Sequence, residues 1–176
     1  MLTWVSMKII EAMKEIKRLA EKLADLQKKV ALHCADLDFE TAVYPDQRRQ
    51  VDEWIQSYTD SVQRILKLRV AIQKTNIETT VSIELGGHHI KKSIAEWVHR
   101  RRDLAKLDQA IWASLTDRNL REGKAQQSAG QTVDVKIRRY YDPATRDEKV
   151  ALYRDEPSLI DAQLEVTNAV TDVIGL

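Results

Sequence analysis

The chain has 176 residues and a formal net charge of +1, with 43% hydrophobic and 31% charged residues. This length suffices for one domain with its own core. Only 5 Gly and 3 Pro interrupt it, so long elements are expected, and a collagen-like or low-complexity chain is excluded. No apolar run reaches the roughly 18 residues that a membrane-spanning helix needs. The near-zero charge gives no general sign of a nucleic-acid partner.

The cysteine content and the N-terminal sequence favour a cytoplasmic location for the protein. The single cysteine, Cys34, excludes an internal disulfide framework and is typical of a reducing compartment. Lys8 and Glu11 interrupt the apolar stretch that a secretory signal would need. We therefore expect a cytoplasmic protein. Residues 1–6 lie outside the regular pattern that follows, and Met7 is a candidate natural start.

Two long stripes of apolar residues predict an antiparallel helical hairpin over 7–74. Each stripe follows an alternating three and four spacing, which places one apolar face along a helix. The apolar positions are Ile9, Met13, Ile16, Ala20, Leu23, Val30, Val51, Ile55, Tyr58, Val62, Ile65 and Ile72. An acidic stretch with Pro45 separates the two stripes. A short break of this kind makes the helices antiparallel neighbours.

After the hairpin, the spacing of apolar residues changes to the alternation that is typical of β-strands and then returns to the spacing of a helix. β-branched residues before a Gly-Gly turn predict a β-hairpin over 77–91. A capping-box pattern that begins at Ser93 predicts a third helix over 93–122. The polar stretch from Lys124 to Gln131 is expected to be a mobile loop.

The last part of the chain is expected to contain a strand and a helix. Clean alternation predicts a strand over 132–141, and Pro157 is expected to open a C-terminal helix within 157–176. After Asn168 we expect a short strand that pairs with 80–85 or with 133–137. The alternative continues the last helix beyond that point. We expect a single domain over 1–176, in the mainly α class with a small β part: a long helical hairpin or coiled-coil bundle plus a small antiparallel sheet.

Two stretches of the sequence echo each other. Ile72–Val81 and Leu164–Val173 both read apolar-x-x-Thr-Asn-x-x-Thr-x-Val. Asn tolerates the left-handed conformation at the end of a helix, and the following Thr and Val favour a strand. The echo therefore indicates two helices that end alike and lead into one small sheet. The alternative is a chance similarity between two helix ends.

Several short motifs occur in an order that is found in one protein family. They are Met7-Lys8-Ile9-Ile10-Glu11-Ala12, Leu26-Gln27-Lys28-Lys29, Ile72-Gln73-Lys74-Thr75-Asn76, Ser93-Ile94-Ala95-Glu96, Arg100-Arg101-Arg102-Asp103, Val135-Lys136-Ile137 and Ile160-Asp161-x-x-Leu164-x-x-x-Asn168-x-x-Thr171. In these motifs the chain resembles the septicolysin-like family of bacterial proteins of uncharacterised function. The resemblance implies a helical-hairpin protein with a small β portion. The family name suggests a cytolysin, but no activity or site residue carries over. Residues 1–6 and the His33-Cys34 pair depart from the pattern.

The residues that could carry chemistry do not form a recognisable site. His88 and His89 are adjacent, so in a strand they point to opposite faces and cannot chelate one ion together. Cys34 has no assigned base, and neither a phosphate-cradling loop nor a serine nucleophile motif is present. We therefore predict no catalytic residue, no metal site, no cofactor and no small-molecule ligand.

Charge is unevenly distributed along the chain. The arginines of Arg100–Arg102 spread over about 300° of a helix, with Arg101 on the apolar stripe, where it would need a carboxylate partner. Without a net positive charge or interleaved aromatic residues, this run does not favour nucleic-acid binding. Residues 64–74 hold four basic residues and no acid, while residues 155–176 hold five acids and no Lys or Arg. Such blocks set register and partner choice, and we expect the acidic last helix to lie against basic residues of the second or third helix.

These patterns lead to three functional hypotheses. We favour a non-enzymatic, homo-oligomeric assembly or interaction protein, because the long apolar stripes and four tryptophans offer more apolar surface than one hairpin can bury. The alternative is a membrane-active, cytolysin-like protein, although its helices mix acids with bases on their polar sides. A nucleic-acid-binding module, or a metal-dependent module that uses the His88–His89 region, comes third.

Overall fold

The computed structural model describes residues 6–126 and 130–176. Within them the chain is mainly α-helical with two small two-stranded antiparallel sheets, so the predicted fold class is confirmed. The described residues group into two compact units, which we call unit 1 and unit 2. Unit 1 comprises the residues up to Val81 together with Ser93–Ala95 and Leu164–Leu176, and unit 2 comprises Ser82–Lys92 and Glu96–Gln163. The single domain over 1–176 stays a prediction.

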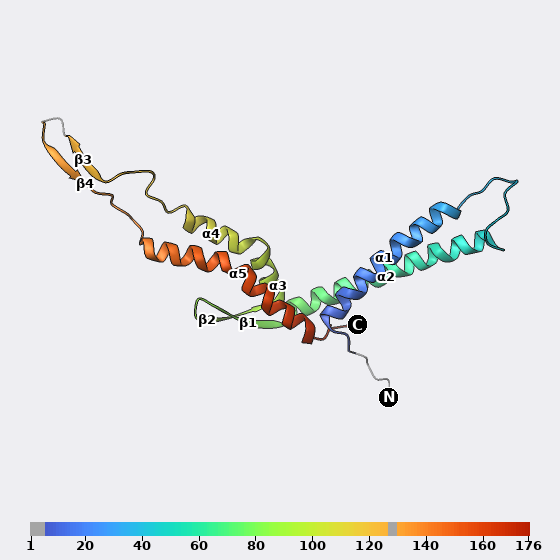
Figure 1. Cartoon of the computed structure of the whole chain (residues 1–176). Helices are drawn as coiled ribbons and strands as arrows, with labels where there is room; N and C mark the ends of the chain where they lie inside the picture. Colours follow the sequence, from blue (N-terminus) through green and yellow to red (C-terminus); the bar gives the residue numbers. More distant parts are fainter. Residues whose placement is uncertain (1–5, 127–129) are drawn as a thin grey trace. The chain divides into compact units, whose positions relative to one another are not determined.

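Unit 1 contains the helical hairpin. Its helices α1 (Ile9–His33) and α2 (Gln47–Glu78) lie side by side (Figure 1). Both begin with a side chain that satisfies a backbone donor of the first turn. The Lys8 N–H donates to the Glu11 carboxylate at 2.7 Å, and the Arg49 N–H donates to Asp46 at 3.0 Å.

The core of unit 1 lies on the facing sides of the two helices. Ala12, Leu19 and Leu68 are buried there, and Ile65 and other half-buried side chains pack against them. The predicted packing stripes were wrong in part, because the helices face one another through these residues, which leaves Met13, Ile55, Tyr58 and Val62 38–51% exposed. Truncating a fully buried leucine such as Leu68 to alanine typically costs about 2–5 kcal/mol. At the far end of the hairpin, His33, Tyr44 and Trp54 form an aromatic cluster with ring centroids 5.3–5.6 Å apart.

The two echoed segments end their helices in the same way. The Thr79 N–H donates to the Thr75 carbonyl at the end of α2, and the Thr171 N–H donates to the Thr167 carbonyl at the end of α5 (Pro143–Val170), both at 2.9 Å. Each helix end then accepts a bond from the first residue of another helix. Ile94 donates to the Thr79 carbonyl at 2.9 Å, and Ile9 donates to the Thr171 carbonyl at 3.0 Å.

The echo is therefore a structural repeat. We call Met7–Val81 the first repeat and Lys92–Val173 the second repeat. Their starts also match, since Lys8-Ile9-Ile10-Glu11 and Ser93-Ile94-Ala95-Glu96 each carry a buried Ile followed by a Glu two residues later. We call the place where these helix starts and helix ends meet the junction. Counting along α1 from the matched starts, and along α2 from the matched ends, gives each residue near the junction a counterpart in the second repeat.

The C-terminal segment pairs with the start of α1. Lys8 and Asp172 form an antiparallel bridge, and the Val173 N–H donates to the Met7 carbonyl at 2.8 Å. The predicted pairing of residues after Asn168 with the strands at 80–85 or 133–137 was wrong. The start of a helix leaves backbone groups unpaired, and those of α1 bind this segment instead.

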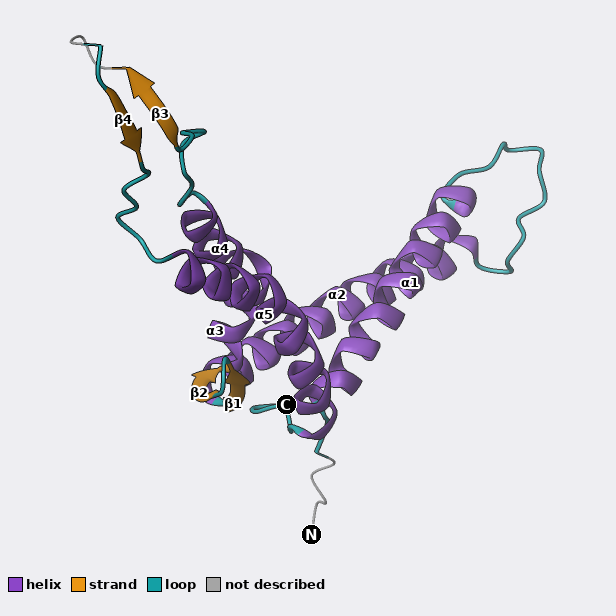
Figure 2. Ribbon diagram, turned by 60° about the vertical axis from the view of Figure 1, so that its left-hand side comes forward, coloured by secondary structure: helices purple, strands orange, loops and turns teal. Residues whose placement is uncertain are grey.

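Unit 2 is built around a second pair of helices. Its elements, apart from α5, are β1 (Thr80–Leu85), β2 (His88–Ser93), α3 (Ile94–His99), the π-helical turn η1 (Arg100–Leu104), α4 (Ala105–Ala113), β3 (Gly123–Gln126) and β4 (Thr132–Val135). Figure 2 shows the two β-hairpins, and α4 lies beside α5 in both views. The β1–β2 turn is made by Gly86 and Gly87, whose φ angles of 57° and 77° suit residues without a Cβ.

The predicted end of the third helix was wrong. The third helix, expected over 93–122, contains the π-helical turn and ends at Ala113. The helix cannot continue to 122, since Arg118 and Asn119 adopt positive φ angles of 54° and 61°, which an α-helix does not accommodate. Arg139 also binds Asp117 through two hydrogen bonds of 2.7 and 2.6 Å, which holds this stretch outside the helix.

The strand expected over 132–141 is shorter, and the stretch expected to be a loop contains its partner. β4 ends at Val135, and β3 pairs with it in the register Gly123↔Val135 to Gln126↔Thr132. β3 has no alternating pattern, so only its pairing with β4 defines it. The tip at 127–129, which is part of the expected loop, lies outside the described residues.

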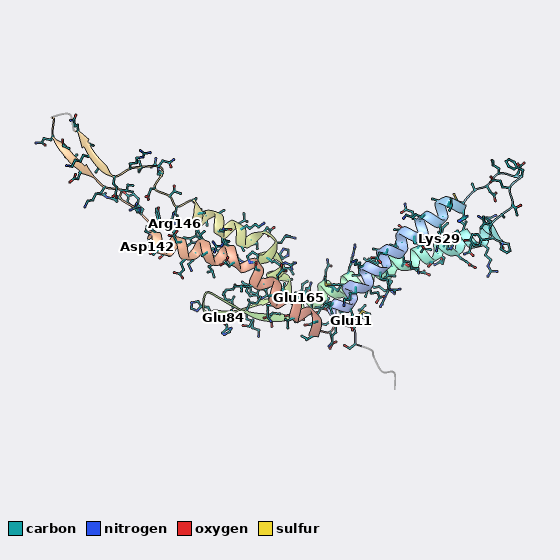
Figure 3. All side chains as sticks on the ribbon, in the orientation of Figure 1. Glu11, Lys29, Glu84, Asp142, Arg146 and Glu165 are labelled. Carbon is teal, nitrogen blue, oxygen red and sulfur yellow. The ribbon has the colours of Figure 1, made fainter. Side chains whose placement is uncertain are left out.

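The last helix begins before the proline that was expected to open it. α5 starts at Pro143, and Pro157 lies inside it. The Asp142 carboxylate accepts the N–H of Thr145 at 2.9 Å, which makes an acidic N-cap followed by proline at the first helical position. Figure 3 labels Asp142 and Arg146 at the start of this helix. The Arg146 guanidinium also donates to the Leu115 carbonyl at 2.8 Å.

Candidate functional site

Unit 2 contains a cavity of about 330 Å³ between β2, the η1–α4 segment and α5. This volume lies at the lower end of the range of small-molecule sites, roughly 300–1,000 Å³. The lining residues combine charged, aromatic and aliphatic side chains. They are Leu85, Gly86, His88, Ile90, Lys92, Trp97, Arg100, Asp108, Glu148, Lys149, Leu152, Tyr153 and Glu156.

An arginine and two carboxylates form the most buried charge network of this cavity. Arg100 donates to both oxygens of Glu156, at 2.7 and 2.6 Å, and to Asp108 at 2.5 Å. The Glu156 side chain is only 3% exposed and that of Arg100 is 20% exposed. The hydrogen bonds to Glu156 raise the pKa of Arg100 further above its ordinary value, so the guanidinium stays charged.

Both helices that carry this network are irregular near it. Arg100 is the first residue of η1, and a π-helical turn holds one residue more than an α-helical turn. The sequence placed Arg101 on the apolar stripe, and this was wrong: Arg100 turns inward, while Arg101 is 39% exposed and binds Asp161 at 2.5 Å. On α5, Pro157 directly follows Glu156. The expectation that acids of the last helix meet basic residues of the third is confirmed.

Two aromatic rings lie beneath cations in the cavity. The Lys92 ammonium is 5.9 Å from the ring centroid of Trp97, and the Arg100 guanidinium is 5.7 Å from that of Tyr153. Both distances are typical of cation–π contacts. Trp97 is fully buried, so its ring forms a fixed floor for the Lys92 side chain.

The histidines and the cysteine singled out in the sequence lie in different surroundings. His88 lines the cavity and His89 does not, as strand alternation requires. His33 belongs to the aromatic cluster of unit 1, and Cys34 is exposed at the end of α1. Among the described residues, no group of three His, Cys, Asp or Glu side chains is arranged to hold a metal ion.

Sequence reasoning missed most of the cavity residues. Lys92, Asp108, Lys149 and Tyr153 follow no motif and lie on three different elements. The one signal that pointed toward the site was the contrast between the basic third helix and the acidic last one. That contrast predicted an ion pair but not a cavity.

The first repeat contains a matching ion pair with the charges exchanged. In unit 1, Arg64 of α2 donates to both oxygens of Glu15 of α1, at 2.9 and 3.3 Å. Glu15 corresponds to Arg100 and Arg64 corresponds to Glu156. The hydrogen bond from Arg64 lowers the pKa of Glu15, although this pair is more exposed, at 20% and 41%.

No protein-family model, curated protein or solved structure matches the chain. The resemblance to the septicolysin-like family therefore stays a prediction. Within residues 6–126 and 130–176, no helix is both long enough and apolar enough to cross a membrane.

Proposed function

We propose that this protein is a cytoplasmic, non-enzymatic assembly protein that forms homo-oligomers through α2. The observation that carries the proposal is a stripe of exposed apolar residues along this helix. The stripe consists of Ile55, Tyr58, Val62, Leu66, Val70 and Ile77, which are 38–68% exposed. At 100° per residue they fall within about 120° of the helix surface, which is the width of a packing face.

This stripe is separate from the face that α2 already buries. The buried residues of α2 are Ser61, Leu68, Ala71 and Thr75, and they lie on the opposite side of the helix. α2 therefore has two packing faces, and within unit 1 only one of them is buried. An exposed apolar face of this length is unusual for a protein that works as a monomer.

Two hollows along the stripe provide space for apolar side chains of a partner. One, of about 630 Å³, lies beside Leu66 and Val70 and is closed by the C-terminal Leu176. The other, of about 370 Å³, lies beside Ile55 and Tyr58. Packing ridges of one helix into such grooves of another is the usual way in which helices associate.

The charges of α2 favour a second copy of the same helix as the partner. Its residues 52–60 contain three acids and no Lys or Arg, whereas residues 64–74 contain four basic residues and no acid. In an antiparallel α2–α2 pair centred on Gln63, residues 52–60 of each copy face residues 66–74 of the other, so that the acidic part of each copy faces the basic part. Such an isologous contact closes as a twofold-symmetric dimer, and its charge pattern opposes the parallel alternative.

Light scattering coupled to size-exclusion chromatography tests this proposal on the full chain. The wild type is expected to have the mass of a dimer or larger closed oligomer, and Leu66→Asp is expected to have the mass of a monomer. Leu107→Asp is the matched control, because Leu107 is an exposed apolar residue of α4, 65% exposed against 54% for Leu66, and lies outside the stripe. A wild type that remains monomeric at high concentration, or a Leu66→Asp variant with unchanged mass, would overturn the proposal.

A charge exchange tests the antiparallel register. Asp52→Lys and Lys74→Asp are each expected to weaken the oligomer, because residues 52 and 74 of the two copies face one another and each change places like charges opposite. The double variant Asp52→Lys/Lys74→Asp is expected to recover the wild-type mass. No recovery would contradict the antiparallel arrangement. Release of dye from liposomes by the wild-type protein would instead support the cytolysin-like alternative.

A further inference from the structure

We propose that the cavity of unit 2 binds a small organic anion, a carboxylate on a short aromatic or aliphatic body. This proposal is independent of the α2 stripe, which belongs to unit 1. It rests on the comparison of the two repeats, on the charges of the cavity and on the shape of its apolar wall.

The first repeat shows what the cavity positions contain when they serve packing alone. Lys92, Trp97, Lys149 and Tyr153 of the second repeat correspond to Met7, Ala12, Ser57 and Ser61 of the first. Ala12 and Ser61 are buried, so the two helices of unit 1 approach closely there. The same helical plan is therefore stable with small and apolar residues at these positions. Charged groups in a helix interface add little stability, so they need another reason.

The helices of the second repeat also depart from regular geometry at this level. Where the second repeat has η1 and Pro157, the first has an uninterrupted α1 and Ile65. Single π-helical turns concentrate at functional sites because they redirect a side chain. Here the redirected side chain is Arg100, which the network with Glu156 and Asp108 then fixes beside the cavity.

The charges that are not engaged in this network favour an anion. Lys92 and Lys149 line the cavity, and neither forms an ion pair with a described residue. Glu156 and Asp108 are occupied by Arg100, which leaves the exposed Glu148 as the remaining lining carboxylate. Two lysines without an ion pair therefore line a space in which Glu148 is the one carboxylate that Arg100 does not bind. An anionic group between Lys92 and Lys149 would satisfy both.

The rest of the wall defines the body of the ligand. Leu85, Ile90 and Leu152 supply aliphatic surface, and Gly86 lies so close to Leu152 that an added Cβ would meet it at 3.4 Å. The Tyr153 ring, which contacts the Arg100 guanidinium, adds aromatic surface to this lining. A lining that combines aliphatic and aromatic side chains with two lysines fits an amphiphilic acid better than inorganic phosphate or a sugar.

Benzoate and benzylamine form a matched pair of probes, since they share a ring and differ in charge. In ¹H–¹⁵N spectra of the full chain, benzoate is expected to shift amides of β2 and of residues 148–156 in a saturable way. Benzylamine is expected to leave them unchanged. Equal shifts with both probes, or benzoate shifts confined to α2, would overturn the proposal.

A double variant tests the role of the two lysines. Lys92→Met/Lys149→Met keeps the aliphatic stems and is expected to weaken benzoate binding at least tenfold. Lys22→Met/Lys28→Met on the exposed side of α1 is the charge-matched control and is expected to bind as the wild type does. Unchanged binding in the first variant would contradict the assignment. Leu152→Trp, which fills the cavity, is expected to abolish binding while the far-UV spectrum stays native.

The oligomer proposal and the cavity proposal can be contradicted independently of one another. Leu66→Asp is expected to bind benzoate with wild-type affinity even as a monomer. Loss of benzoate binding in that variant would show that the effect arises from the α2 stripe and not from the cavity. That outcome would contradict the cavity proposal whatever the mass of the wild-type protein.

Discussion

The two repeats carry the same cross-helix ion pair with donor and acceptor exchanged, and they use it differently. In the first repeat the Glu15–Arg64 pair is partly exposed beside closely packed small residues. In the second, the Arg100–Glu156 pair is nearly buried and lies at the wall of a cavity. A bidentate Arg–carboxylate contact constrains the geometry of two helices and not the direction of the charge. What differs between the repeats is therefore the neighbourhood of the pair.

This difference shows how a position that packs two helices together in one repeat can line a cavity in the other. Ala12 in the first repeat lets the helices meet, while its counterpart Trp97 is a fully buried ring that carries Lys92 above it. The scaffold is held by the features that the repeats share, namely the matched helix ends and starts. The experiments below separate those shared features from the local ones.

The largest effect is expected from the matched junction itself. Deleting residues 171–176 removes the three hydrogen bonds that join this segment to the first repeat: Ile9 N–H to Thr171, Val173 N–H to Met7, and Ile174 N–H to Thr75. At about 1 kcal/mol for each bond, together with the lost packing of Val173, we expect the free energy of unfolding to fall by at least about 3 kcal/mol. Urea denaturation measures it. Deleting only Leu176 is the control, and an unchanged midpoint in the longer deletion would contradict the repeat junction.

The second-largest effect is expected when each of the two ion pairs is broken and the losses in the free energy of unfolding are compared. Glu156→Gln leaves Arg100 largely buried with Asp108 as its remaining carboxylate, and we expect a loss of about 2–4 kcal/mol. Glu15→Gln breaks the more exposed pair and is expected to cost less than about 1 kcal/mol. Equal losses in the two variants, measured by urea denaturation, would show that the neighbourhood of the pair does not matter.

A smaller effect is expected at a buried threonine of the junction. The Thr75 hydroxyl donates to the Ala71 carbonyl and accepts the Ile174 N–H, so Thr75→Val leaves that amide without its partner. We expect a loss of about 1–2 kcal/mol. Thr59→Val is the control, because the exposed Thr59 hydroxyl makes the same kind of bond to a carbonyl of its own helix. A control loss as large as that of Thr75→Val would mean that burial at the junction contributes nothing.

The smallest effect concerns pH. Because Arg64 lowers the pKa of Glu15 in the folded protein, Glu15 contributes stability above its unfolded pKa of about 4.3. This contribution is lost as the pH falls through the folded pKa. The stability difference between wild type and Glu15→Gln is therefore expected to be constant above about pH 5 and to vanish at lower pH. If the stability difference between wild type and Glu15→Gln instead grew as the pH fell, it would contradict a lowered pKa of Glu15 in the folded protein.

Periodicity predicted the parts of the fold in which side-chain spacing and burial agree. The stripes through Ile9 and Ile72 indicated the hairpin, and the Gly-Gly turn indicated β1 and β2. Periodicity failed where one residue breaks the count. The π-helical turn exchanges the roles of Arg100 and Arg101, and nothing in the sequence marks it. The cavity was not predicted at all, because its residues meet only after distant elements have packed.

The proline at position 157 was also misread for a physical reason. Proline is common at the first position of a helix, and Pro143 occupies such a position in this chain. An internal proline is tolerated only when the surrounding packing outweighs the lost bond. Ile160 and Leu164, both buried, provide that packing just after Pro157.

That proline has a consequence for the dynamics of α5. Because Pro157 has no N–H, the ladder of backbone hydrogen bonds is interrupted there, and the two segments of the helix can open independently. The later segment buries Ile160, Leu164 and Thr167, whereas the earlier one buries only Glu156. Amides after the proline should therefore exchange with solvent deuterium more slowly than those before it, and a long helix would behave as two cooperative units.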